Sequence, residues 1–310
     1  MQNIKPPKVS VCIVTYNQEQ YIRQCLQSVV DQEVDFEVEI IVSDDCSTDS
    51  TPQIIQEFAE KYKNIIPALR QENVGAFRNF VETHNMATGE YVCHLDGDDY
   101  WLQGKIRAQT RYLDNNINCN ICYTRGYIKN SITGDMKEDL FIYKNKFIFT
   151  RSDILRNISI GLHSSKMYRR HCRDYSYPPI EITDFFEDVE QVKKGTANYI
   201  GEEIYTVYLS GNGISGNEKV TSSVRQSLLY FLNKYPEEKI NINISALMIL
   251  LQNIKRKRNP LKFLHLFFKS FHFKTLFKFP IHYIEVKNHS SPFKKCQTLY
   301  YSSKKICSKN

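Results

Sequence analysis

The sequence lacks any apolar run long enough to cross a membrane, and it lacks an apolar segment before its first predicted strand. The longest purely apolar stretches, such as Ala246–Leu251, fall far short of the roughly 20 residues that a spanning helix needs. The N-terminal residues contain two prolines in place of the apolar core of a secretion signal. We therefore expect a cytoplasmic protein that is neither secreted nor membrane-spanning.

The cysteines show no pattern that indicates a disulfide framework or a metal site. Nine cysteines are spread over 310 residues without regular spacing, so the sequence predicts neither a disulfide scaffold nor a structural zinc site. A reducing compartment fits this usage best.

Acidic residues almost disappear from the last part of the chain. Residues 251–310 carry 14 Lys or Arg and a single acid, Glu285, whereas the first 250 residues carry 27 basic and 33 acidic residues. Such asymmetry is typical of a segment that meets a polyanion. No nucleic acid is expected as the partner, because no recognised nucleic-acid-binding module accompanies the charge.

The segment 255–280 interleaves Lys and Arg with Leu and Phe. If it forms one helix, four apolar residues share a face: Leu261, Leu264, Phe268 and Phe271. Basic amphipathic segments with aromatic side chains bind anionic membrane surfaces, and we favour peripheral association with the inner face of the cell membrane. The alternative is a helix that packs its phenylalanines on the rest of the protein while its lysines stay solvated.

Strand and helix patterns alternate over the first hundred residues. Val9–Val14 and Val38–Val42 are buried-strand patterns, each followed by apolar residues at helical spacing, and Tyr91–Leu95 is a further strand. This alternation predicts an α/β fold with a mixed, mostly parallel sheet flanked by helices, which binds ligands beyond the carboxyl ends of its strands. We place one domain at 1–216 and a helical, basic, aromatic C-terminal extension at 217–310.

Two carboxylates, Asp44 and Asp45, follow the second strand. Helix capping accounts for the hydroxyl-rich residues just after them, because Ser, Thr and Asp accept hydrogen bonds from the first turn of a helix. Capping does not account for adjacent carboxylates, whose repulsion needs donors from the protein or from a ligand. The ring N–H of a nucleotide base is one such donor.

A second acidic cluster, HLDGDD, follows the strand Tyr91–Leu95 and precedes the only tryptophan. It holds Asp96, Asp98 and Asp99, and Gly97 lets the backbone turn between them. Mg²⁺ and Mn²⁺ are held by one or two carboxylates together with substrate phosphates. The alternative is an acidic surface turn, which is common at Asp-Gly.

These segments occur together in a recognisable order. VSVCIVTYNQEQYIRQCLQSVVDQ, VEIIVSDDCSTDST, ENVGAFRNF and ATGEYVCHLDGDDYWLQGKIRAQ together resemble the family 2 glycosyltransferases of GT-A fold. The resemblance implies an inverting enzyme that uses a nucleotide-sugar, usually a UDP-sugar, with Mn²⁺ or Mg²⁺. It implies that the nucleotide contacts Val14, Thr15, Tyr16, Asp45, Arg78, Asp96 and Gly97, and that the metal is bound by Asp98, Asp96 and Asp99, with Asp98 the first choice.

The resemblance continues through GLHSSKMYRR to about Ser215, where an acidic residue precedes a helix that ends in Gly. It implies that Asp184 is the general base, which removes a proton from the acceptor hydroxyl. The alternative is ordinary negative charge at a helix N-terminus, with Glu187 and Asp188 on a solvated face.

One departure from the family pattern concerns a metal-binding histidine. Many relatives have Arg and His after a Tyr near the end of this region, but here the stretch runs from Tyr208 to Asn212 without either. His163 is the nearest histidine on the acceptor side, and we rank it low because a lone His is more often structural than a ligand.

The sequence therefore predicts a metal-dependent transferase that moves a sugar from a nucleotide-sugar to a hydroxyl of a glycan or lipid-linked saccharide, in bacterial surface polysaccharide synthesis. A catalytically silent nucleotide-sugar-binding module of the same fold is the main alternative. A phosphotransferase of the haloacid-dehalogenase type is a weaker alternative. Such enzymes carry their DxD motif near the N-terminus, whereas the motif lies at residues 96–99 in this chain.

Overall fold

The computed structural model describes residues 7–139, 147–210, 218–256 and 258–288. One mixed sheet runs through the first two of these segments in the order β3-β2-β1-β4-β9-β6-β10-β5. Its strands are β1 Val9–Thr15, β2 Val38–Asp44, β3 Ile65–Leu69, β4 Tyr91–Asp96, β5 Tyr100–Trp101, β6 Cys119–Asn130, β7 Met136–Glu138, β8 Ile148–Phe149, β9 Met167–Arg169 and β10 Thr196–Ser210.

The sheet combines two parallel blocks. Strands β3, β2, β1 and β4 are parallel, as are β6 and β10. The short strand β9 joins the blocks and is antiparallel to both neighbours, while β5, β7 and β8 add antiparallel pairs at the other end. The predicted mixed, mostly parallel α/β sheet flanked by helices is confirmed.

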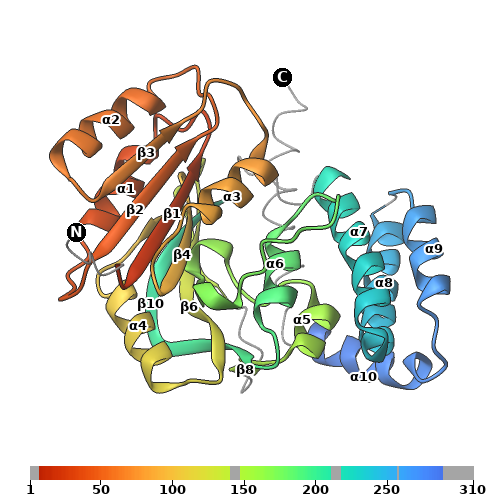
Figure 1. Ribbon diagram of the computed structural model, residues 1–310. Helices are drawn as coiled ribbons and strands as arrows, with labels where there is room; N and C mark the ends of the chain where they lie inside the picture. Colours follow the sequence, from red (N-terminus) through yellow and green to blue (C-terminus); the bar gives the residue numbers. More distant parts are fainter. Residues whose placement is uncertain (1–6, 140–146, 211–217, 257, 289–310) are drawn as a thin grey trace.

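Helices cover both faces of the sheet and continue beyond it (Figure 1). They are α1 Ile22–Val30, α2 Thr51–Lys61, α3 Ala76–Asn85, α4 Lys105–Asn115, α5 Arg151–Asn157, α6 Asp184–Gln191, α7 Glu218–Lys234, α8 Lys239–Lys255, α9 Leu261–Lys269 and α10 Thr275–Asn288. Among the described helices, none is both long and apolar enough to pass through a lipid bilayer.

Two hydrophobic clusters hold the layers together. One joins the apolar faces of α1, α2 and α4 to β1, β2 and β4. The other joins the opposite face of the sheet to α5 and α6 and continues into α7, α8 and α9 through side chains such as Phe186, Phe231 and Phe263. The C-terminal helices thus share a core with α5 and α6, and the domain boundary at residues 216 and 217 stays a prediction.

The basic C-terminal segment differs from the single helix considered above. Helix α9 ends at Lys269 and α10 begins at Thr275, so Phe271 lies in the connection and does not share one helical face with Leu261. Phe263 and Leu266 of α9 are buried, whereas Leu261 and Phe268 are exposed. The segment therefore packs one side on the protein and leaves another side uncovered.

The described cysteines form no disulfide. Cys119 and Cys122 have the spacing C-x-x-C, but both lie on β6 and are buried. Burial raises the pKa of both thiols, which keeps them protonated and poorly suited to bind a metal.

Candidate active site

The ends of β1 and β4 lie side by side because the two strands are parallel and in register. Val14 pairs with Asp96, and the N–H of Gly97 donates to the carbonyl of Val14 over 2.9 Å. A Cβ atom on Gly97 would come within 2.8 Å of the Cβ of Thr15. Glycine is required here by this close approach, and not by the tight turn that the sequence suggested.

Asp45 follows β2 at the same edge of the sheet and is 3% exposed. Its two carboxylate oxygens accept hydrogen bonds from the N–H groups of Val74, over 2.8 Å, and Gly75, over 2.9 Å. The donors that this carboxylate needs therefore come from the loop before α3. A base could reach Asp45 only through a remaining lone pair or by displacing this loop.

The neighbouring carboxylate, Asp44, obtains its donors from Ser47. The N–H of Ser47 donates over 2.8 Å and its hydroxyl donates to the other oxygen. Asp49 does serve the start of α2, since its carboxylate accepts from the N–H of Thr51 over 2.9 Å. Asp49 thus accepts from the first residue of α2, whereas Ser47 stabilises Asp44.

Asp99 is turned into the protein. It is 1% exposed, and its oxygens accept from the hydroxyl of Ser164 over 2.5 Å and from the N–H of Leu209 over 2.7 Å. Burial and the negative charges of Asp98 and Asp96 raise its pKa well above the usual value. The side chain ties the DGDD turn to two distant segments of the chain.

Asp96 and Asp98 are less buried than Asp99. Burial, followed by the negative charge of Asp96, raises the pKa of Asp98 to about 7, against a lowering influence of a hydrogen bond with Gln18. A bound cation stabilises most strongly those neighbouring carboxylates whose simultaneous ionisation is otherwise unfavourable. The fit to a divalent cation is therefore good at this pair.

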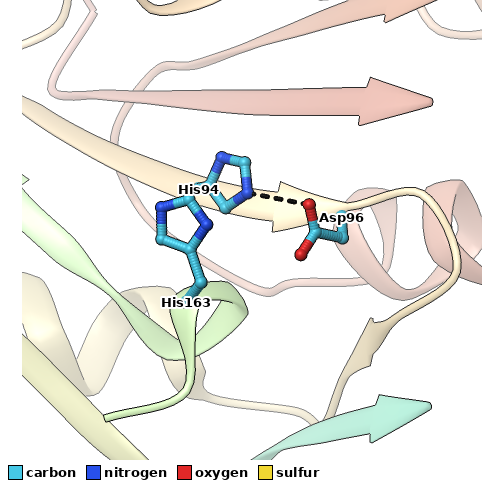
Figure 2. A group of neighbouring side chains, drawn as sticks. All are labelled: His94, Asp96 and His163. Atoms are coloured by element: carbon cyan, nitrogen blue, oxygen red, sulfur yellow. Dashed lines mark hydrogen bonds and ion pairs between the residues drawn. The ribbon is translucent and has the colours of Figure 1, made fainter. Parts of the chain in front are cut away.

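Two histidines lie beside Asp96. The Nε2 atom of His94 is 3.1 Å from Oδ1 of Asp96, and the rings of His94 and His163 stack with centroids 3.7 Å apart. One nitrogen of each ring and one oxygen of Asp96 lie within 4.8 Å of one another. Figure 2 shows the two rings stacked beside the end of β4, with the dashed contact running from His94 to Asp96.

A buried chain of hydrogen bonds extends from this cluster into the core. His84 Nε2 lies 2.9 Å from His94 Nδ1, and His84 Nδ1 lies 2.9 Å from the hydroxyl of Tyr168. Burial, followed by the positive charge of Arg173, lowers the pKa of His84 well below the usual histidine value. His84 is therefore neutral near pH 7.

Asp184 is the first residue of α6. Its Oδ1 accepts from the N–H of Phe185 over 2.8 Å, which leaves the second oxygen for another partner. The residue is exposed to solvent, although protein atoms surround its carboxyl group. Burial, followed by the negative charges of Asp188 and then Asp96, raises its pKa, and Lys166 opposes this.

The two acidic residues that follow are buried, so the interpretation of Glu187 and Asp188 as a solvated face is wrong. Glu187 accepts from the hydroxyl of Tyr177 over 2.6 Å and pairs with Arg173 at 3.2 Å. Asp188 pairs with Lys166 at 2.6 Å, where both side chains are at least 93% buried. These contacts fix α6 beneath Asp184.

Two of the predicted donor-site residues, Tyr16 and Arg78, lie at the protein surface, whereas Thr15 is buried. Tyr16, which directly follows β1, is 47% exposed. Arg78 is on the first turn of α3, and its side chain is 65% exposed and pairs with Glu82 at 2.6 Å. In the stretch that lacks the family's Arg and His, Leu209 contacts Asp99 through its backbone, while Gly211 and Asn212 lie outside the described residues.

Comparison with known proteins fits this arrangement of strand ends. Residues 10–175 match the family model described as Glycosyl transferase family 2. The chain belongs to this family. The matched residues include the DGDD turn and the two histidines beside it.

Among the relatives of this family 2 chain, an uncharacterised protein of Mycobacterium tuberculosis is 42% identical over 117 residues, which are 37% of this chain and 34% of that protein. The match thus spans about a third of the length of that relative. TuaG of Bacillus subtilis, named as a teichuronic acid biosynthesis glycosyltransferase, is 32% identical over 220 residues, which are 70% of this chain and 85% of TuaG.

Solved structures show the same fold. TarS 1-349 of S. aureus in complex with UDP-GlcNAc superposes with a TM-score of 0.64 and 18% identity, over 97% of this chain and 92% of that one. The mannosyltransferase PcManGT of Pyrobaculum calidifontis, in complex with GDP-Man and Mn²⁺, has a TM-score of 0.52 and 16% identity, over 93% and 76% of the two chains. The fold of this family 2 protein is therefore the GT-A fold of TarS.

Proposed function

We propose that the protein is an inverting, metal-dependent glycosyltransferase that moves a sugar from a nucleotide-sugar, most simply a UDP-sugar, to a hydroxyl of a glycan or lipid-linked saccharide. The observation that carries this proposal is that Asp45, Asp96 and Asp98 lie at one edge of the sheet. Asp184 lies near them, close enough for the charge of Asp96 to raise the pKa of Asp184. Membership of the family and the similarity to TuaG support a role in bacterial surface polysaccharide synthesis.

The donor would lie across the ends of β1, β2 and β4. Val14 and Thr15 end β1 and Tyr16 follows it, and these three residues would line the nucleotide together with Gly97 and Asp96. Asp45 would accept from the base after the loop at Val74 and Gly75 has shifted. Arg78 is exposed on α3 and would reach the diphosphate after leaving Glu82.

The metal would be held by Asp98 and Asp96, the less buried pair of the cluster. Its chemistry there would be to neutralise the charge that develops on the departing nucleoside diphosphate. We assign Asp99 a different role from the one that the resemblance implies, because Ser164 and Leu209 already occupy its oxygens. It would hold the DGDD turn in place.

Asp184 would be the general base. Its free oxygen would accept the proton of the acceptor hydroxyl as that hydroxyl attacks the anomeric carbon. A raised pKa makes the carboxylate a better proton acceptor than an ordinary aspartate. A single displacement of this kind inverts the anomeric centre.

The C-terminal helices would place the enzyme on an anionic membrane surface. More than half of the exposed large apolar side chains in the described residues lie between Leu251 and Ile284, and six of these are at least 59% exposed: Leu261, Phe268, Phe273, Leu276, Phe277 and Ile281. Lysines are interspersed among them in the sequence. Apolar burial combined with attraction between lysines and anionic lipids is the basis of interfacial binding.

Isothermal titration with nucleotide-sugars and Mn²⁺, followed by a donor hydrolysis assay, tests the proposal. Metal-dependent binding with turnover supports it. Binding without turnover, even with acceptor extracts present, would identify a catalytically silent module.

A further inference from the structure

The hydroxyl of Ser164 joins the two ends of the DGDD turn, Asp96 and Asp99. Its oxygen accepts from the N–H of Asp96 over 3.1 Å, and it donates to Oδ2 of Asp99 over 2.5 Å. A hydroxyl has a single proton to donate, so its 3.5 Å contact with the Asp96 carboxylate is secondary. Ser164 is 0% exposed and lies on the short 3-10 helix His163–Ser165. One buried side chain thus holds the residue that begins the turn and the residue that ends it.

The carboxylates of the turn differ in their exposure. Asp99 is 1% exposed, whereas the side chain of Asp96 is 35% exposed and Asp98 is also partly exposed. Carboxylates this close repel one another, so an inward-facing one needs donors for its oxygens. Asp99 receives them from Ser164 and from the N–H of Leu209. Ser164 therefore keeps Asp99 inward, and the other two carboxylates stay open to a cation.

The 3-10 helix that carries Ser164 is anchored from its other side by β5 and α4. The Nε1–H of Trp101 donates to the carbonyl of Ser164 over 2.8 Å. The side-chain amide of Gln109 donates to the carbonyls of Ser165, over 2.9 Å, and Cys122, over 2.8 Å. Trp101 and Gln109 are buried, so a shift of this helix would leave buried donors without acceptors, which is costly. The hydroxyl of Ser164 is thus held in a fixed place.

We infer that Ser164 is a positioning residue for the proposed metal site: its hydroxyl turns Asp99 inward and holds the N–H of Asp96, so that the turn presents its other carboxylates to one cation. The inference rests on the proposed function and deepens it, because it assigns the arrangement of the carboxylates to a residue outside the acidic cluster. Ser164 acts through the turn and makes no contact with the metal itself. Loss of a group that orients metal ligands from behind typically weakens metal binding by about 10- to 100-fold.

Ser165 offers a matched control for Ser164. The two serines are adjacent and both are 0% exposed, and the hydroxyl of Ser165 donates to the carbonyl of Leu162 over 2.8 Å. Replacing either serine with Ala removes a buried hydroxyl and its hydrogen bonding. Only Ser164→Ala also removes the contacts with the DGDD turn. A purely structural role of Ser164 therefore predicts that the two variants bind metal alike.

Titration of the full chain with Mn²⁺ in the presence of UDP, followed by the electron paramagnetic resonance signal of free Mn²⁺, tests the inference. Ser164→Ala is expected to weaken Mn²⁺ binding by about tenfold or more, and Ser165→Ala is expected to leave it unchanged. Without metal, hydrogen exchange at the N–H of Asp96 should be faster in Ser164→Ala than in Ser165→Ala, because this N–H has lost its acceptor. In donor hydrolysis, Ser164→Ala should need more Mn²⁺ for its half-maximal rate but approach the wild-type rate at saturating Mn²⁺.

Affinities are compared at a temperature at which circular dichroism shows both variants to be folded. Equal Mn²⁺ affinities of Ser164→Ala and Ser165→Ala, together with Mn²⁺ binding by the wild type, overturn this inference alone. Failure of the wild-type protein to bind Mn²⁺ in the presence of UDP overturns it together with the proposed metal dependence.

Discussion

Replacing Asp184 with Asn separates catalysis from donor binding. An Asn side chain has nearly the same shape, and its amide oxygen can still accept from the N–H of Phe185, now at 2.8 Å. It cannot accept the proton of an acceptor hydroxyl. The change is therefore small for the fold and large for the proposed reaction.

The expected size of the effect follows from general base catalysis, which contributes about 10²- to 10⁴-fold. Because each tenfold is about 1.4 kcal/mol, Asp184→Asn is expected to raise the activation barrier by about 3 to 5 kcal/mol. The free energy of unfolding of the Asp184→Asn variant should not fall below that of the wild type. Burial and the charges of Asp188 and Asp96 raise the pKa of Asp184, so its ionised form is less favourable in the folded protein than in the unfolded one, and Asn removes that cost.

Transfer to acceptor is measured by release of nucleoside diphosphate, and donor affinity by isothermal titration with Mn²⁺. Asp35→Asn, at an exposed aspartate between α1 and β2, is the control. The base must be ionised, so kcat/KM of the wild-type enzyme should fall as the pH decreases. Because the pKa of Asp184 is raised, this fall should occur at a higher pH than an ordinary aspartate would give. Near-wild-type transfer by Asp184→Asn would refute the assignment, and the contacts of Glu187 and Asp188 leave neither as a ready substitute.

Four further outcomes are expected. Asp98→Asn should abolish Mn²⁺-dependent donor binding in titrations while leaving the circular dichroism spectrum unchanged. Gly97→Ala should lower the free energy of unfolding by about 1–3 kcal/mol in urea, because the added Cβ overpacks the end of β1. The double variant Phe268→Ser and Phe277→Ser should lose sedimentation with anionic vesicles, and unchanged binding would favour simple packing of the segment. Stability should decrease as pH falls below about 6.5, by up to about 1.4 kcal/mol per pH unit for one group, because His84 is neutral when folded and becomes protonated when unfolded. His84→Gln should flatten that slope in urea titrations.

The strand ends were predictable because apolar runs followed by carboxylates show where parallel strands stop. Val14 ends one apolar run and Asp45 and Asp96 come after two others, and parallel register alone brings them to one edge of the sheet. The sequence also predicted a helix starting near Asp184. It predicted the position of these side chains much better than their contacts.

The contacts depend on residues far apart in the chain. Asp99 is paired with Ser164, 65 residues away, and with Leu209, 110 residues away, and no local pattern reports either. His94 appeared within the HLDGDD motif without a role, although its alternation with Asp96 was a usable signal. Its stacking on His163 depends on how β9 joins the two parallel blocks.

The central claim is that this family 2 protein transfers a sugar from a nucleotide-sugar with inversion. The most direct measurement is a screen of the purified protein against nucleotide-sugars with and without Mn²⁺, followed by NMR of the product of any donor that is consumed. We expect at least one donor, most simply a UDP-sugar, to bind only with the metal and to yield a product with inverted anomeric configuration. Failure of every nucleotide-sugar to bind, or a product with retained configuration, would contradict the claim.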